Sequence, residues 1–105
     1  MNHWIVVGKE NAIAPGEWQV FDYEGQLIII VNYNNTLYAM EDKCTHDGGT
    51  LSDGDMEGDE LICPRHGARF CVRTGEATVP PAYEDIETFP VRVHEGMIEV
   101  DVSDL

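Results

Sequence analysis

Two short pairs of metal-ligand residues constrain this chain of 105 residues more than any other feature of its sequence. The first pair is Cys44 and His46, the second is Cys63 and His66, and sixteen residues separate the two pairs. Two thiolates and two imidazoles are enough to complete the coordination of one zinc ion or of a two-iron cluster. The fold must therefore bring two loops together around one centre.

The spacing within the pairs is unusual for a structural zinc site. Such sites commonly begin with two cysteines separated by two to four residues and end with two histidines. Here each loop supplies one cysteine and one histidine. A mixed pair from each loop suits a centre in which one iron takes both cysteines and the other takes both histidines. We therefore favour a two-iron cluster and keep a structural zinc module with the same four ligands as an alternative.

The residues around both pairs resemble those of the two cluster loops of Rieske iron–sulfur proteins. The resemblance is carried by CTHDGG at 44–49 and CPRHGARF at 63–70, with weaker support from segments 74–77, 80–83, 89–93 and 98–101. It implies a single Rieske domain over residues 1–105, with a cluster-binding subdomain at approximately 43–70. It also implies one Rieske 2Fe-2S cluster, whose cofactor-binding and metal ligands are Cys44, His46, Cys63 and His66.

Three further positions indicate which branch of the family this chain resembles. In the high-potential branch each cluster loop has an additional cysteine, and the two form a disulfide; the corresponding residues here are Gly49 and Arg65. Ala68 stands where that branch has a serine that donates a hydrogen bond to sulfur. Because a lost donor leaves the reduced cluster less stabilised, we expect a low reduction potential. The chain thus resembles the ferredoxins of ring-hydroxylating oxygenase systems.

This resemblance implies a one-electron carrier with no catalytic activity of its own. Its partners would be a flavin-dependent reductase and a terminal oxygenase. A small Rieske-like subunit of a nitrite reductase is an alternative, because such subunits share the fold. A self-contained oxygenase would need a second iron held by two histidines and a carboxylate. Only His3 and His94 remain, one near each end of the chain, so we expect that the protein is not an enzyme.

The charge balance restricts the kinds of partner. Acidic residues number 20 and basic residues 6, a net charge of −14. Such a field repels nucleic acids and anionic membranes, so we expect neither as a partner. It favours a partner with a basic docking patch. The apolar runs at 5–7 and 27–31 are too short for a signal peptide or membrane anchor, so we expect a cytoplasmic protein with reduced thiols.

Short apolar segments separated by glycine, proline and asparagine predict an all-β chain. The run at 26–32 is apolar on both faces, which predicts a buried strand, and Asn34-Asn35 predicts a turn into a return strand at 36–40. A hairpin is predicted from 91–94 and 97–102 around Glu95-Gly96. Further strands are expected at 4–7, 18–21, 60–63 and 69–72. The pattern favours an antiparallel sandwich or small barrel, into which the cluster-binding subdomain is inserted.

Several residues outside the ligand pairs have simpler interpretations. Cys71 is expected to be a small core residue, and Phe70 to pack beneath the cluster. Trp18 and Tyr83 are expected to serve packing rather than electron transfer. The acidic segment 53–60 is expected to be a solvated turn between two strands. Three arginines lie in or just after the second loop: Arg65, Arg69 and Arg73. Arg65 is expected to be exposed, where it helps docking, offsets the acidic surface or is simply a solvated charge.

Overall fold

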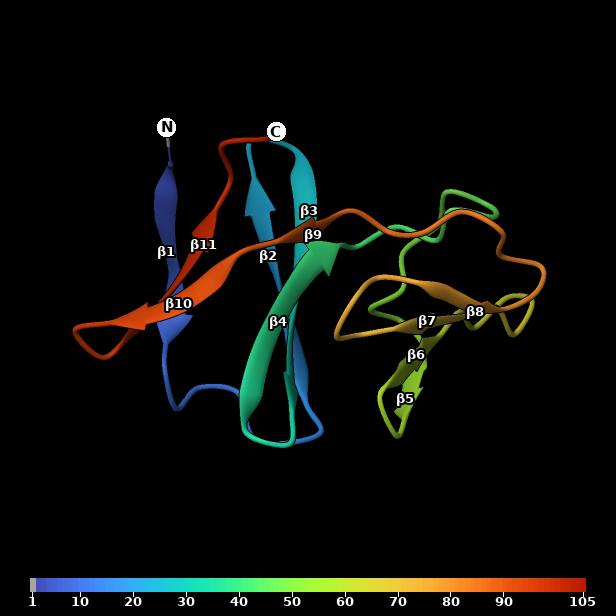
Figure 1. Ribbon diagram of the computed structural model, residues 1–105, viewed down its shortest axis with the longest axis horizontal. Helices are drawn as coiled ribbons and strands as arrows, with labels where there is room; N and C mark the ends of the chain where they lie inside the picture. Colours follow the sequence, from blue (N-terminus) through green and yellow to red (C-terminus); the bar gives the residue numbers. More distant parts are fainter. Residues whose placement is uncertain (1) are drawn as a thin grey trace.

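The computed structural model describes residues 2–105, which form eleven strands, all paired antiparallel, and no helix (Figure 1). None of these residues therefore belongs to a helix that could cross a membrane. The all-β prediction is confirmed. The strands are β1 (Trp4–Lys9), β2 (Trp18–Tyr23), β3 (Gln26–Tyr33), β4 (Thr36–Glu41), β5 (Asp55–Glu57), β6 (Glu60–Ile62), β7 (Arg69–Cys71), β8 (Ala77–Val79), β9 (Thr88–Phe89), β10 (Val91–His94) and β11 (Met97–Asp101).

The strands form three sheets, which divide the molecule into two parts. One sheet has the order β1-β11-β10 and a second has the order β2-β3-β4-β9; together they make what we call the base. The third sheet, β5-β6-β7-β8, lies beside the base (Figure 1). The chain leaves the base after β4 and re-enters it at β9, and we call residues 42–87 the inserted unit. The expected subdomain at 43–70 contains both ligand loops, whereas the third sheet continues to Val79.

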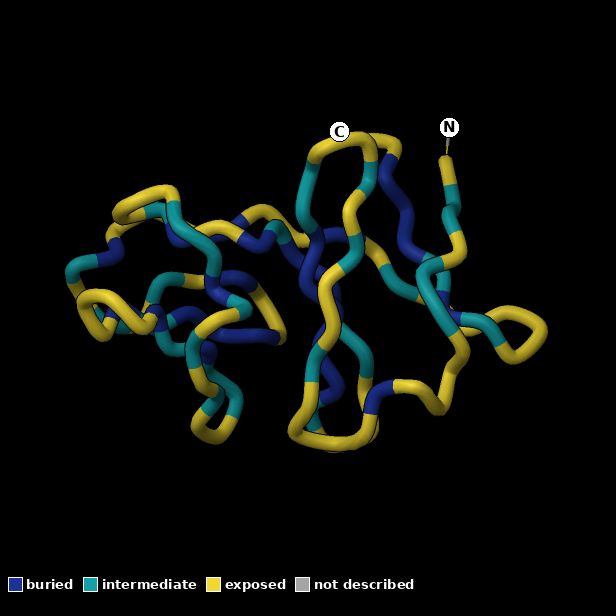
Figure 2. Tube along the Cα trace, turned by 180° about the vertical axis from the view of Figure 1, so that it is seen from behind, coloured by how far each residue is buried: buried dark blue, intermediate teal, exposed yellow. Residues whose placement is uncertain are grey.

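Strand β3 lies between two apolar cores, and this position explains why its sequence is apolar on both faces. Ile28 and Ile30 belong to a core in the base, together with Ile98 of β11. Ile29 and Val31, on the opposite face, belong to a second core that includes the buried apolar residues of the inserted unit. Figure 2 shows buried segments in both parts of the molecule and exposed hairpin tips around them. One strand thus anchors the inserted unit to the base.

Local turn chemistry sets the registers of the two predicted hairpins. Asn34 and Asn35 have φ of 53° and 67°, which the two-residue turn between β3 and β4 requires. Glu95 and Gly96 have φ of 53° and 76° in the turn between β10 and β11. Asn34, Asn35 and Gly96 are residue types that tolerate these left-handed conformations at low cost, whereas Glu95 is not. Both hairpins therefore follow from short sequence signals.

Two expectations from the sequence are wrong. The acidic segment 53–60 is not a single turn: residues 55–57 form β5, which pairs with β6, because Met56 packs against the second core. Tyr83 is not a packing residue, since it is 82% exposed. Trp18 does pack against the second core, and its indole N–H donates to the Ser52 carbonyl (N···O 3.1 Å). Cys71 is buried, as expected for a small core residue.

Candidate metal centre

The first ligand loop begins at Cys44, shortly after β4 ends. The Gly48 N–H donates to the Cys44 carbonyl (N···O 2.8 Å), and the Cys44 N–H donates to the Gly49 carbonyl (2.7 Å). Gly48 has φ of 76°, a left-handed conformation that glycine adopts without steric cost. The loop is therefore a closed six-residue turn that places the Cys44 and His46 side chains close together along the chain.

The second ligand loop begins at Cys63, directly after β6, and has the same closure. The Gly67 N–H donates to the Cys63 carbonyl (3.1 Å), the Cys63 N–H donates to the Ala68 carbonyl (2.8 Å), and Gly67 has φ of 74°. The predicted ligand His66 occupies the fourth position of this turn, whereas His46 occupies the third position of the first turn. The two loops thus share one backbone scaffold despite their different ligand spacing.

A third turn of the same kind begins at Cys71. The Gly75 N–H donates to the Cys71 carbonyl (2.7 Å), the Cys71 N–H donates to the Glu76 carbonyl (2.8 Å), and Gly75 has φ of 78°. Sequence reasoning missed this repeat, although Cys-x-x-x-Gly at 44–48, 63–67 and 71–75 is its signal. The third turn has a cysteine but no histidine, so it shares the scaffold without the Cys/His pair of the two ligand loops.

The structure brings the predicted ligands together as two pairs, the cysteines with each other and the histidines with each other. The Cys44 and Cys63 side chains are buried, and their sulfur atoms lie within 4.8 Å of each other and of an Asp47 carboxylate oxygen. His46 and His66 are exposed, and their ring centroids are 5.1 Å apart with an interplanar angle of 86°. Sulfur donors therefore lie inside the protein and nitrogen donors lie at its surface.

Burial raises the pKa of the Cys44 thiol above its ordinary value. Backbone hydrogen bonds from Asp47 and His46 act in the opposite direction, because N–H groups that point at the sulfur favour its thiolate. The neighbouring Cys63 raises the pKa further through a hydrogen bond and a like charge. Two thiols at this separation need a cation to hold both as thiolates, and an iron or zinc ion would supply it.

Asp47 and Arg65 connect the two ligand loops, which sequence reasoning did not find. The Arg65 guanidinium forms an ion pair with the Asp47 carboxylate. This hydrogen bond, followed by one from the Gly49 N–H (2.9 Å), lowers the pKa of Asp47 to about 2. The same pairing raises the pKa of Arg65. Arg65 is exposed, as expected, but it is ion-paired, so of its expected roles only that of an unpaired solvated charge is excluded; the sequence signal was an arginine between two ligands.

Two further contacts hold the first loop in place. Asp42 is buried and its carboxylate accepts hydrogen bonds from the Leu51 N–H (2.8 Å), the Ser52 N–H (2.8 Å) and the Ser52 hydroxyl (2.6 Å). The Thr45 hydroxyl donates to the Glu84 carbonyl (2.6 Å), which joins the loop to the segment before β9. Asp42 immediately follows β4, so the loop is anchored directly to the base.

Apolar side chains surround the two cysteines on the protein side. Leu51, Leu61 and Phe70 are fully buried in the same core as Cys44 and Cys63. Phe70 thus shares a core with the two cysteines, and its expected place beneath the cluster stays a prediction. An apolar surrounding excludes water from the sulfur donors and strengthens electrostatic interactions there.

The donor set fits a two-iron cluster. Two buried sulfurs and two exposed imidazoles would supply an asymmetric ligation, in which the cysteines would hold one iron and the histidines the other. Backbone N–H groups of His46 and Asp47 approach the Cys44 sulfur within the first turn. A zinc ion could use the same four donors.

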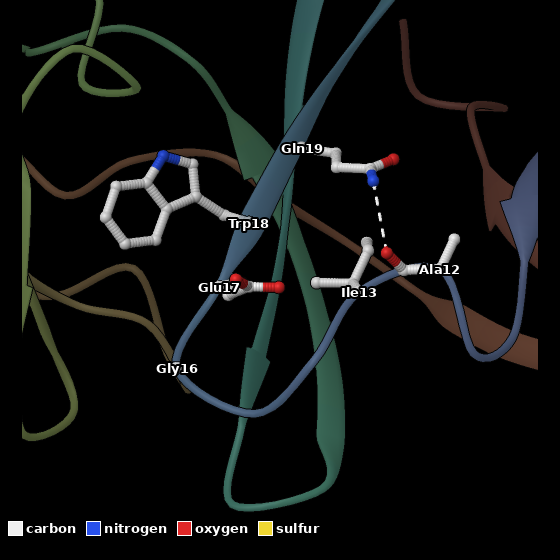
Figure 3. Close-up of a pocket in the computed structure, with 6 residues that line it drawn as sticks. All are labelled: Ala12, Ile13, Gly16, Glu17, Trp18 and Gln19. Carbon is white, nitrogen blue, oxygen red and sulfur yellow. Dashed lines mark hydrogen bonds between the residues drawn. The ribbon is translucent and has the colours of Figure 1, made fainter.

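A separate surface cavity of about 400 Å³ lies in the base, beside the start of β2 (Figure 3). Its lining includes Ala12, Ile13, Trp18 and Gln19, and the Gln19 amide donates to the Ala12 carbonyl (3.2 Å). In Figure 3 the Trp18 indole points away from Ala12 and Ile13. The cavity lining contains neither cysteine nor histidine, so we assign it no part in the metal centre.

Known proteins match this chain in sequence along most of its length. Residues 3–90 match the family model described as the Rieske [2Fe-2S] domain. The chain is 35% identical over 94 residues to a biphenyl dioxygenase ferredoxin subunit of Pseudomonas sp. (strain KKS102), covering 89% of this chain and 86% of the relative. It is 33% identical over 100 residues to the ferredoxin component of a naphthalene 1,2-dioxygenase system of Pseudomonas putida, covering 95% and 96%.

Solved structures show the same fold. A chain in a complex of reduced oxygenase and oxidized ferredoxin of carbazole 1,9a-dioxygenase superposes with a TM-score of 0.89 at 32% identity, covering 93% of this chain and 92% of that one. The ferredoxin of carbazole 1,9a-dioxygenase from Nocardioides aromaticivorans IC177 gives 0.86 at 29% identity, covering 92% and 95%. With the family model matching most of its length, this chain belongs to the Rieske [2Fe-2S] domain family.

Proposed function

We propose that this protein carries single electrons from a reductase to the terminal oxygenase of a dioxygenase system. It belongs with the ferredoxin components of such systems and is an electron carrier rather than an enzyme. Family membership implies one Rieske 2Fe-2S cluster per chain. The observation that carries the proposal is the pairing of two buried sulfur donors with two exposed imidazoles between two matching turns.

In this proposal the four donors have different tasks. A bound 2Fe-2S cluster supplies one-electron oxidation and reduction, and two neutral imidazoles in place of thiolates make its reduction electrostatically easier. Cys44 and Cys63 supply thiolates from the buried side. His46 and His66 hold the exposed side, where a partner protein can approach their rings. The buried core beneath the cysteines keeps water away from the sulfur donors.

The partners and the compartment are extensions of the same proposal. A ferredoxin bound to its oxygenase is described for carbazole 1,9a-dioxygenase, and we propose an equivalent complex for this protein. We also propose a flavin-dependent reductase as the electron donor. A net charge of −14 favours basic docking surfaces on both partners and a salt-sensitive association. Three free cysteines fit the reducing cytoplasm.

Metal analysis of the purified protein tests the cofactor. We expect two irons and two acid-labile sulfides per chain, a red-brown colour, and an EPR signal in the reduced state with an average g value below that of the free electron. A colourless protein that holds one zinc and no sulfide would instead support the zinc module.

Electron delivery tests the function. The reduced protein, mixed with an oxidised terminal dioxygenase of the aromatic-ring type, should transfer one electron per chain, and raising the salt concentration should slow the reaction. A nitrite reductase offered under the same conditions is the comparison. If nitrite reductase accepts the electrons and the dioxygenase does not, the assignment to a dioxygenase system is wrong.

A further inference from the structure

The two ligand loops are joined by Arg65, which lies in the second loop between the proposed ligands Cys63 and His66. Its guanidinium pairs with the Asp47 carboxylate of the first loop, and its Nη2 donates to the Thr50 carbonyl (3.0 Å). The Arg65 and Asp47 side chains are 34% and 19% exposed, so the pair lies near the protein surface, where solvent screens it in part. One side chain thus connects both halves of the metal centre.

Gly49 provides the space for this connection. A Cβ at position 49 would lie 2.5 Å from Cζ and 2.6 Å from Nη2 of Arg65, which is closer than real contacts of this kind. The guanidinium therefore packs against the backbone of the first loop at a position where any side chain would displace it. The position of the Arg65 guanidinium therefore requires glycine at residue 49.

The charges of this pair face the proposed ligands. The Asp47 Oδ2 atom lies 4.0 Å from Cys63 Sγ and 3.8 Å from His66 Nδ1. Reduction adds one negative charge to the centre. A carboxylate at this distance opposes the added charge, and a guanidinium favours it. In the intact pair the two effects oppose each other.

We propose that Asp47 and Arg65 are positioning residues that hold the two ligand loops together and set the reduction potential through opposing charges. The carboxylate lowers the potential and the guanidinium raises it. This inference rests on the proposed function, because it takes the cysteines and histidines of the two loops as the cluster ligands.

The third turn of the chain contains a natural control. There, Arg73 Nη2 donates to Asp59 Oδ2 (2.8 Å), and the same carboxylate oxygen lies 3.9 Å from Cys71 Sγ. Cysteine, arginine and aspartate therefore repeat the contacts of Cys63, Arg65 and Asp47. Because the third turn has no histidine ligand, its charges belong to the scaffold and not to the metal centre.

The experiment measures the midpoint potential of the cluster-loaded protein by voltammetry at neutral pH. Asp47→Asn should raise the one-electron equilibrium constant for reduction about tenfold, which is about 59 mV. Arg65→Gln should lower it by a similar factor. The double variant should return close to the original potential, and Asp59→Asn should leave it unchanged.

A purely structural role gives a different pattern. In that case both single variants would lose the cluster faster without potential shifts of opposite sign, and that result would overturn the inference. Should Arg65→Gln fail to retain the cluster, Asp47→Asn and the charge-conserving Asp47→Glu decide the question. Asp47→Asn must raise the reduction potential, and Asp47→Glu must leave it unchanged. Equal potentials for these two variants would contradict the charge effect.

Failure of this inference can be told apart from failure of the proposed function. If the unaltered protein binds no iron and sulfide, the ligand assignment itself is wrong. If the unaltered protein carries the cluster but Asp47→Asn leaves its potential unchanged, the ligands stand and the role of Asp47 and Arg65 does not.

Discussion

The base and the inserted unit are held together by different kinds of interaction. In the base, β2, β3 and β4 pair over six residues each, and β3 is buried almost throughout. In the inserted unit no strand exceeds three residues. Three arginines there pair with carboxylates across turns: Arg65 with Asp47, Arg69 with Glu57 and Glu60, and Arg73 with Asp59. Long ladders and apolar packing support one part, and short strands with ion pairs support the other.

This difference indicates which part depends on the metal centre. Ion pairs near the surface contribute little to stability, because solvent screens them and both side chains lose freedom. Metal binding, in contrast, contributes directly to the folding free energy of a small unit that it cross-links. The inserted unit should therefore need its cluster for stability, and the base should not.

The largest expected effect comes from removing one proposed ligand. His66→Ala should abolish the cluster and greatly reduce hydrogen-exchange protection of amides in β6 and β7, while amides of β3 and β11 stay protected. Iron analysis and hydrogen exchange followed by NMR measure both effects. His94→Ala, an exposed histidine of the base, is the control and should keep the cluster. Loss of protection throughout the base would refute the independence of the two parts.

Two neighbouring isoleucines of β3 test whether the base and the inserted unit behave as separate parts, because this strand contributes to the cores of both. Ile29 faces the core that contains the cysteines, and Ile30 faces the core of the base. Alanine at either buried position should destabilise the protein by about 2–5 kcal/mol, because each creates a cavity. Urea unfolding should show this loss in both variants.

The two isoleucine variants should differ in how they hold the cluster. Ile29→Ala should speed cluster loss, followed by visible absorbance at a urea concentration that leaves the base folded. Ile30→Ala should change that rate much less. Equal rates of cluster loss would show that the two cores behave as one unit.

The smallest expected effect concerns pH and lies in the base. N–H groups of His3 and Ser103 donate to the Asp101 carboxylate (both 3.0 Å) and lower its pKa. Because its pKa is lower in the folded state, Asp101 stabilises the protein at pH values above the ordinary aspartate pKa. That stabilisation is lost as the pH falls through the pKa of Asp101 in the folded protein. Asp101→Asn should therefore flatten the decline in urea midpoint below about pH 4.

The control for this variant is Asp104→Asn, at an exposed position near the end of the chain. It should leave the acid limb of the stability profile unchanged. An Asp101→Asn profile that runs parallel to that of the unaltered protein from neutral to acid pH would show that this carboxylate does not contribute to acid sensitivity.

The sequence alone predicted features that depend on neighbouring residues. The pairs Cys44/His46 and Cys63/His66 indicated the donors of a two-iron centre, and the family match supports that cofactor. The Asn34-Asn35 turn and the Glu95-Gly96 turn indicated hairpins, and both are present. Each of these signals acts within a few residues, because ligand spacing and turn geometry are set by the local backbone.

Only the tertiary structure decided which distant residues meet. Asp47 pairs with Arg65, which is 18 positions away in the sequence, and Asp59 pairs with Arg73, which is 14 positions away. These contacts depend on how the pairing of β6 with β7 and the packing of the second core position the three similar turns relative to one another. No local pattern records that arrangement, since a charge in a loop looks the same in the sequence whether water or another loop neutralises it.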